Sequence, residues 1–182
     1  KILLGLTAIL MLTGAAVPVK ADDVWKFDAE HFVLEEYTGT ETDVVVPDTM
    51  DDGVPVKRLG TQLLAGSETL TSVVVPDSVT ILDSGALSYD DNLAEITLSS
   101  NLINIGRNAI SSNDALTELT IPASVCIIDS YAVSGCYALK KIVFEGACPL
   151  IGSEAFVMLS DDVVIYVPDD QIEEYKKVFE EN

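Results

Sequence analysis

Histidine is a common catalytic side chain near neutral pH, and this chain has one, His31. It could serve as the base of a serine hydrolase, but no nucleophile motif of the form Gly-x-Ser-x-Gly occurs in the sequence. A glycine-rich phosphate loop and a basic aromatic patch are missing as well. We therefore predict a structural or surface role for His31, no catalytic residues and no cofactor.

Carboxylates are the most abundant groups that could perform chemistry. Asp and Glu number 30 against 10 Lys and Arg, which gives a formal charge of −20. Two carboxylates flanking a sugar would suit a glycosidase, which we keep as a remote alternative. So large a negative charge disfavours nucleic acid and anionic membranes as partners, because both carry like charge. It favours a soluble monomer.

Calcium is a metal that clustered aspartates could bind. The candidates are five doublets: Asp22-Asp23, Asp51-Asp52, Asp90-Asp91, Asp161-Asp162 and Asp169-Asp170. None of them fits an EF-hand loop or the glycine-rich nonapeptide repeat of calcium-binding solenoids. Aspartate is also favoured at turns for its own hydrogen bonding, so we predict no metal site.

The cysteines, Cys126, Cys136 and Cys148, are odd in number, which excludes a complete disulfide framework. A four-cysteine zinc site would need one more. We therefore expect buried or half-buried thiols that act as small hydrophobic side chains.

A spacing of 23 residues organises most of the chain. Apolar residues recur at six positions of the unit over four units: Leu70, Leu93, Leu116, Leu139; Val73, Ile96, Leu119, Ile142; Val75, Leu98, Ile121, Phe144; Leu82, Ile105, Ile128, Ile151; Ala86, Ala109, Ala132, Ala155; and Leu87, Ile110, Val133, Phe156. Such a period indicates stacked repeats, since one unit cannot bury its apolar face alone. We predict a right-handed, β-rich leucine-rich repeat solenoid, with a parallel sheet on one face and short turns or 3₁₀ helices on the other.

The outward positions of the predicted sheet are the candidate binding face. Residues 71–75 alternate in type, which places Val73 and Val75 inward and Ser72 and Val74 outward. One outward column is Val45, Val74, Thr97, Thr120, Val143 and Tyr166; its neighbour is Asp43, Ser72, Glu95, Glu118, Lys141 and Val164. β-Branched residues also suit strands that bind nothing, and this simpler interpretation stays open. Six strands would form a sheet about 25 Å wide.

One slot of the unit holds Gly or Asp in every repeat: Gly60, Asp83, Gly106, Asp129 and Gly152. Both residue types tolerate a left-handed backbone, so we expect positive φ angles at this slot. The first unit is six residues longer than the others, and the extra residues within 48–54 are predicted to form a small hairpin.

The two ends lack the repeat and are predicted to differ from the middle. Residues 2–19 are an uncharged run flanked by Lys1 and Lys20, which predicts that residues 1–21 are a signal peptide cleaved after Ala21. A membrane anchor is the alternative, but the run is short of the about 20 apolar residues that a span needs. Residues 22–42 are predicted as an N-terminal β cap, 43–168 as the solenoid, and 169–182 as a capping helix begun by Asp169 or Asp170.

The repeat resembles that of the bacterial BspA-type leucine-rich repeat family. The stretch Leu116-Thr-Glu-Leu-Thr-Ile-Pro122 follows the family pattern, as do the later positions Val125, Ile128, Ala132, Val133 and Cys136. Residues 37–56 are similar to the family's usual entry and residues 165–175 to its usual exit. The resemblance implies a secreted or surface protein, which in several members is an adhesin, and it brings no catalytic residues.

The leading functional hypothesis is therefore a secreted or cell-surface module that binds a protein or glycan without catalysis. Its partner would belong to a host matrix or to another bacterial surface. The alternative is a structural spacer or a fragment of a larger surface protein.

Overall fold

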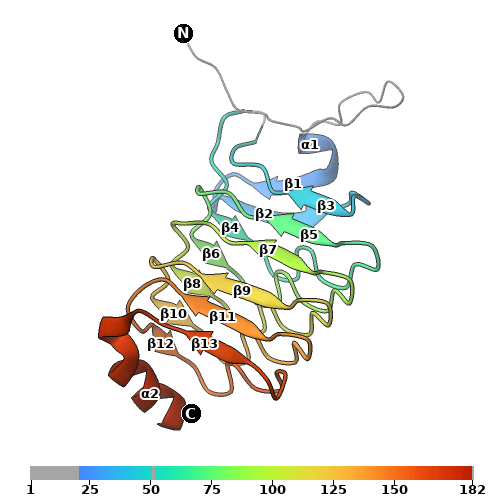
Figure 1. The fold of residues 1–182 in the computed structure, drawn as a ribbon. Helices are drawn as coiled ribbons and strands as arrows, with labels where there is room; N and C mark the ends of the chain where they lie inside the picture. The colour runs from blue at the N-terminus through green and yellow to red at the C-terminus, as the bar shows by residue number, and fades with distance from the viewer. Residues whose placement is uncertain (1–20, 51, 182) are drawn as a thin grey trace.

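The computed structural model describes residues 21–50 and 52–181, where the chain winds as a β-solenoid of stacked rungs (Figure 1). The predicted signal peptide, apart from Ala21, lies outside the described residues, as does Asp51. The solenoid expected from the 23-residue spacing is confirmed. None of the helices in the described part of the chain is long and apolar enough to cross a membrane.

The front of the solenoid carries one short parallel strand per rung. In the described residues these strands are β3 (Asp43–Val45), β5 (Ser72–Val74), β7 (Glu95–Thr97), β9 (Glu118–Ile121), β11 (Lys141–Phe144) and β13 (Val164–Tyr166). Their pairing follows the 23-residue alignment, so that Ile142 lies between Leu119 and Ile165. The predicted hairpin in the first unit is present, because Thr49 and Pro55 form an antiparallel bridge.

A second sheet lies behind the first. It starts with the antiparallel pair β1 (Trp25–Asp28) and β2 (Val33–Tyr37), which follow the short helix α1 (Ala21–Val24). It continues in parallel through β4 (Arg58–Leu59), β6 (Ile81–Leu82), β8 (Asn104–Ile105), β10 (Ile127–Ile128) and β12 (Leu150–Ile151). The second apolar piece of every unit therefore forms a sheet of its own. No 3₁₀ helix occurs within residues 57–167, where turns join the back sheet to the front one.

These turns make up the third side of the solenoid, called the turn side below, on the right in Figure 1. Backbone hydrogen bonds link neighbouring rungs here as well: the amide of Leu87 donates to the carbonyl of Ala109 at 2.8 Å, and that of Ile110 to Ala132 at 2.8 Å. The alanines of this column are buried between the rungs. Alanine is invariant there because a larger side chain would separate two rungs held by these bonds.

The prediction of positive φ at the Gly/Asp slot is wrong. The left-handed residues form two other columns on the turn side: Gln62, Gly85, Asn108, Tyr131 and Glu154, and Gly66, Tyr89, Ser112, Gly135 and Met158. Glycine occupies the Gly/Asp slot for lack of space: a Cβ at Gly106 would lie 2.6 Å from the carbonyl oxygen of Leu82, and one at Gly152 would lie 2.5 Å from the amide nitrogen of Ser130. In both cases the obstacle is the backbone of the preceding rung.

Both ends of the core are closed by aromatic side chains. Trp25 packs on Tyr37 at the N-terminal end, with ring centroids 4.2 Å apart. At the other end α2 (Ile172–Glu181) follows a 3₁₀ turn (Asp169–Gln171) and places Tyr175 4.9 Å from Phe144. The expected capping by Asp169 or Asp170 is wrong, since both lie inside the 3₁₀ turn, which follows Pro168 without a side-chain cap.

Candidate functional site

The structure brings the two predicted outward columns together on the front sheet. Cα pairing aligns Asp43, Ser72 and Glu95, and aligns Val45, Val74 and Thr97 beside them. Toward the C-terminus the same two columns continue as Glu118, Lys141 and Val164, and as Thr120, Val143 and Tyr166. The inward neighbours are buried except for the half-buried Ile96 and Ile165, whereas Thr97, Thr120 and the other outward side chains are exposed or half-buried.

Charged side chains on this face form hydrogen bonds and an ion pair with residues on neighbouring strands or next to them. The Asp43 carboxylate accepts hydrogen bonds from the hydroxyls of Ser72 at 2.6 Å and Thr71 at 3.1 Å, which lower its pKa. Further along, Lys141 Nζ lies 2.9 Å from the Glu118 carboxylate. Both pairs are solvent-exposed, so they orient side chains and contribute little to stability.

The front sheet is not the single six-stranded sheet that the repeats predict. Its backbone pairing is interrupted between β7 and β9, which leaves two three-stranded halves. The interruption coincides with the place where two acidic residues, Glu95 and Glu118, occupy neighbouring positions of one column, and like charges opposite each other destabilise strand pairing. Ile96 on β7 is half-buried at this point, whereas Val73 and Leu119 in the same slot of the neighbouring strands are 1% exposed.

The most apolar part of the face lies at its C-terminal end. Val164 is 50% exposed and Tyr166 is 52% exposed, and Val143 lies half-buried on the adjacent strand. Val164, Tyr166 and Val143 together form what is called the apolar corner below. Exposed aromatic residues of this kind are common anchors in protein interfaces.

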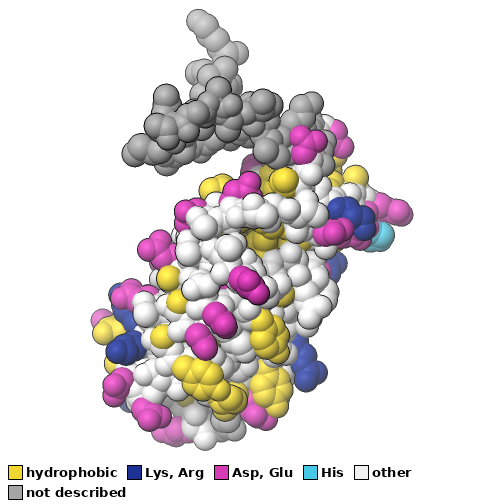
Figure 2. Space-filling model, turned by 90° about the vertical axis from the view of Figure 1, so that its right-hand side faces the viewer, with side chains coloured by type: hydrophobic (Ala, Val, Ile, Leu, Met, Phe, Trp, Pro, Cys, Tyr) yellow, Lys and Arg dark blue, Asp and Glu magenta, His cyan; other side chains and the backbone are white. Residues whose placement is uncertain are grey.

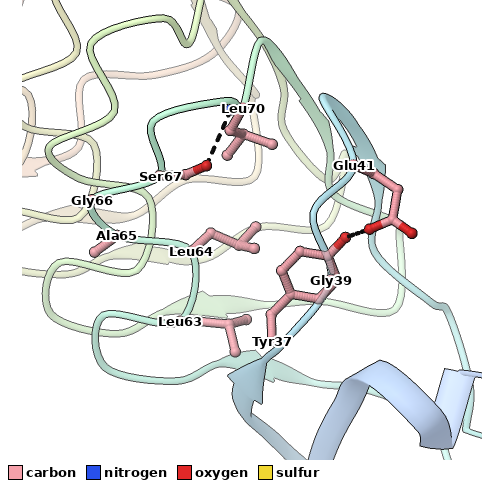
Figure 3. A pocket seen from close by; sticks show the side chains of 9 residues that line it. All are labelled: Tyr37, Gly39, Glu41, Leu63, Leu64, Ala65, Gly66, Ser67 and Leu70. Atoms are coloured by element: carbon pink, nitrogen blue, oxygen red, sulfur yellow. Dashed lines mark hydrogen bonds between the residues drawn. The ribbon is translucent and has the colours of Figure 1, made fainter.

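A hollow of about 220 Å³ opens at the N-terminal rung, beside the loop that follows β2 (Figure 3). Its floor is made by the buried side chains of Leu63, Leu64 and Leu70. At its rim the Tyr37 hydroxyl donates to the Glu41 carboxylate, an interaction that lowers the pKa of Glu41. Partial burial and the same carboxylate raise the pKa of Tyr37. Glu41 is the one carboxylate that lines this hollow.

A second hollow of about 360 Å³ lies on the turn side, and sequence reasoning missed it. It is lined by Thr61, Gln62, Ser84, Gly85, Ser88, Tyr89 and Asn108. These residues fall in the left-handed columns or next to them. The available signal was the recurrence of glycine and asparagine at a spacing of 23 residues, at Gly85 and Asn108 and again at Gly66 and Gly135.

The groups that suggested catalysis or metal binding are placed in structural roles. His31 lies in the β1–β2 turn, with Nδ1 2.6 Å from the Asp28 carboxylate, which also accepts two backbone amides of that turn. Among the described residues no group of three or more His, Cys, Asp or Glu side chains could hold a metal ion. Neither hollow is lined by two carboxylates, which a glycosidase would need.

The three cysteines are free thiols with different surroundings. Cys136 is fully buried, and its Sγ lies 3.3 Å from the Ile110 carbonyl; burial raises the pKa of this thiol to about 11. Cys148 is half-buried. The prediction of buried or half-buried thiols is wrong for Cys126, which is exposed because it occupies the outward slot of Ile103 on the preceding rung.

The stacked rungs, the 23-residue columns and the two caps define the molecule as a leucine-rich repeat solenoid. The chain belongs to the BspA-type leucine-rich repeat family, whose model matches residues 57–182 in six copies. Proteins of this family are generally non-catalytic. No curated protein matches the chain.

Several solved structures share this fold. A leucine-rich repeat protein from Bacteroides capillosus is 32% identical with a TM-score of 0.57, over 67% of this chain and 93% of that one. The leucine-rich repeat protein of T. pallidum is 22% identical with a TM-score of 0.52, over 85% and 92% of the two chains. A leucine rich cell surface protein from Faecalibacterium prausnitzii is 19% identical with a TM-score of 0.60, over 82% of this chain and 39% of that one.

Proposed function

We propose that this chain is an exported, non-catalytic binding module that attaches to a macromolecule of a host matrix or of another bacterial surface through its front sheet. The observation that carries the proposal is the apolar corner. In each front strand only the inward residues contribute to the core, and Val164 and Tyr166 are outward residues that are about half exposed. Membership of the BspA-type family and the surface location named for one structural neighbour support it.

The front face also has the shape of an interaction surface rather than of an active site. Its strands present two columns of outward side chains, and neither of the two hollows described above is lined by a residue of these columns, whereas catalysis generally requires a concave, water-excluded pocket. Short polar and β-branched side chains flank the apolar corner, and Glu118 and Lys141 form an ion pair beside it. This face therefore has an aromatic anchor surrounded by a polar rim, which is the arrangement found in protein interfaces.

Export is the first testable part of the proposal. When the gene is expressed in a Gram-positive host with its start codon supplied, the secreted protein is expected to begin at Asp22, because the run before Ala21 has the features of a signal peptide. Intact mass measured on the culture medium checks this. Secreted protein that retains residues 1–21, or protein found only in the membrane fraction, would contradict it.

Binding through the apolar corner is the second part. A screen against immobilised host matrix proteins and intact bacteria supplies a partner, and the double variant Tyr166→Ala, Val143→Ser is expected to weaken its binding at least about tenfold, since the anchor is lost. Thermal unfolding should be nearly unchanged. Tyr137→Ser, a change at a 55% exposed tyrosine that lies outside both outward columns, is the matched control and should bind like the wild type.

Two outcomes would overturn this assignment. Undiminished affinity of the double variant, combined with loss of binding on changes around Trp25 or in the 48–54 hairpin, would move the site to the N-terminal cap. A screen in which the folded protein binds nothing would favour the spacer alternative.

A further inference from the structure

The turn-side hollow is a polar groove in a strongly acidic protein. Lys, Arg, Asp and Glu make up 22% of the chain, yet none of the seven residues that line this groove is charged. Figure 2 looks onto the turn side and shows surface formed by backbone and uncharged polar side chains, in white, among scattered acidic side chains and patches of hydrophobic ones. The hydroxyls of Thr61 and Ser84 and the side-chain amide of Gln62 make no hydrogen bond to any described residue, so they are free to bind a ligand.

The floor of the groove is created by a missing side chain. Gln62, Gly85 and Asn108 occupy one left-handed column on three successive rungs, with φ angles of 56°, 66° and 55°. Glycine is not required there by the backbone, since Gln62 and Asn108 adopt the same conformation. Neighbouring rungs are about 4.8 Å apart, so the backbones of Gln62 and Asn108 lie about 10 Å apart across Gly85. The Gln62 side chain lies close to the glycine, with Cγ 3.3 Å from the position that a Cβ would take.

Tyr89 forms the wall of the groove at a conformational cost. Its φ of 63° is left-handed, a conformation in which bulky residues are strained, and the equivalent positions in two other rungs are Gly66 and Gly135. The side chain is 57% exposed and makes no hydrogen bond or ring contact with a described residue. By contrast Tyr131, the other left-handed tyrosine, is held by Arg107 over its ring and by a hydrogen bond to Glu154. Ser112 and Met158 are left-handed at the same position of later rungs, so the repeat imposes this conformation, and what distinguishes Tyr89 is its exposed and uncommitted aromatic ring.

We propose that this groove binds a neutral carbohydrate, at a site separate from the front sheet. A pyranose ring offers an apolar face of C–H groups that stacks on an aromatic ring such as Tyr89. Its hydroxyls both donate and accept hydrogen bonds, which matches the amides of Gln62 and Asn108 and the hydroxyls of Thr61 and Ser84. The absence of a basic side chain in the groove and the charge of −20 disfavour sulfated, phosphorylated or sialylated sugars.

The probes are neutral hexasaccharides of glucose, mannose, xylose and N-acetylglucosamine, titrated into the secreted protein and followed by NMR chemical shifts and calorimetry. At least one of them is expected to bind, and Tyr89→Ser should weaken that binding at least about tenfold. Ser112 holds the equivalent position with a φ of 57°, so the variant is expected to fold. Gly85→Asn, which copies Asn108 of the next rung, would place its Cβ 3.1 Å from Ser88 Oγ and 3.3 Å from Gln62 Cγ, so it should crowd the floor of the groove and also abolish binding. Gln62→Ala replaces it in the test if Gly85→Asn does not fold, and should weaken binding by removing one amide.

Tyr137→Ser is the matched control, because Tyr137 is 55% exposed and lies two rungs further along, in the turn before β11. It should bind the sugar like the wild type. The proposal is overturned if no hexasaccharide binds at millimolar concentration, or if the sugar binds equally to Tyr89→Ser and Gly85→Asn. It is also overturned if Tyr89→Ser abolishes binding of a protein partner instead. A negative result for the groove would not count against binding through the front sheet. That proposal is tested separately, with the Tyr166→Ala, Val143→Ser variant and its own partner.

Discussion

Leu119→Ala is expected to lower the free energy of unfolding by about 2–5 kcal/mol, the transfer and cavity cost of a buried leucine. Leu119 lies on β9 in the middle of the solenoid and is 1% exposed, with rungs on both sides. The outward neighbour Thr120 is exposed, and Thr120→Ala should cost less than about 1 kcal/mol. Urea titrations of the two variants measure the difference.

A graded control comes from the interrupted pairing of β7 and β9. Ile96 occupies the slot of Leu119 one rung earlier but is half-buried, so Ile96→Ala should cost less than Leu119→Ala. Equal losses for Leu119→Ala and Thr120→Ala would show that the inward and outward assignment is wrong. Equal losses for Leu119→Ala and Ile96→Ala would show that the sheet is continuous at this point.

Asp90→Asn is expected to stabilise the protein by about 2–4 kcal/mol above pH 7, since a tenfold change in proton affinity corresponds to about 1.4 kcal/mol. Asp90 is fully buried, and burial raises the pKa of its carboxyl from 3.8 to about 7. Oδ1 accepts the Ser67 amide at 2.6 Å, while Oδ2 has no partner. Asn113 in the same slot of the next rung uses its Nδ2 to donate to two carbonyls at 2.9 Å. An asparagine at position 90 would present the same donor.

The sign of the pH dependence follows from the raised pKa. The folded state holds the Asp90 proton more tightly than the unfolded state, so this contribution to stability is complete below about pH 4 and is lost as the pH rises to about 7. The stability difference between Asp90→Asn and the wild type should therefore grow from pH 4 to pH 8 in urea titrations. Asp91→Asn, at the exposed neighbouring residue, is the control for removing one acidic side chain from this turn. A pH-independent difference for Asp90→Asn would mean that Asp90 titrates normally.

The 23-residue columns were sufficient to predict which side chains of each strand face the core, because one period aligns every rung. They did not predict the interruption of backbone pairing between β7 and β9, which coincides with Glu95 and Glu118 on neighbouring strands. They also assigned positive φ to the wrong slot. Gly106 and Gly152 are selected for close approach of the preceding rung, whereas left-handed backbone occurs at Gln62, Tyr89 and Met158, whose residue types give no such signal.

The burial of the polar column formed by Asp90, Asn113 and Cys136 was likewise not predictable from the repeat spacing. Their spacing was visible in the sequence, but aspartate at the end of a repeat suggested an exposed turn and a calcium ligand. Burial here depends on hydrogen bonds between rungs, such as the Asp90 amide donating to Asn113 Oδ1 at 3.1 Å. Binding surfaces are harder still, because the outward columns satisfy strand preference whether or not they contact a partner.

Hydroxyl-radical footprinting of the secreted protein with its surface partner bound at saturation tests the proposed binding face most directly. Tyr166, Tyr89 and Tyr137 are exposed to similar extents, at 52%, 57% and 55%, so they report on the front sheet, the groove and a control surface with comparable reactivity. The partner is expected to protect Tyr166 strongly and to leave Tyr137 reactive. Unchanged oxidation of Tyr166 in the saturated complex would contradict binding through the front sheet.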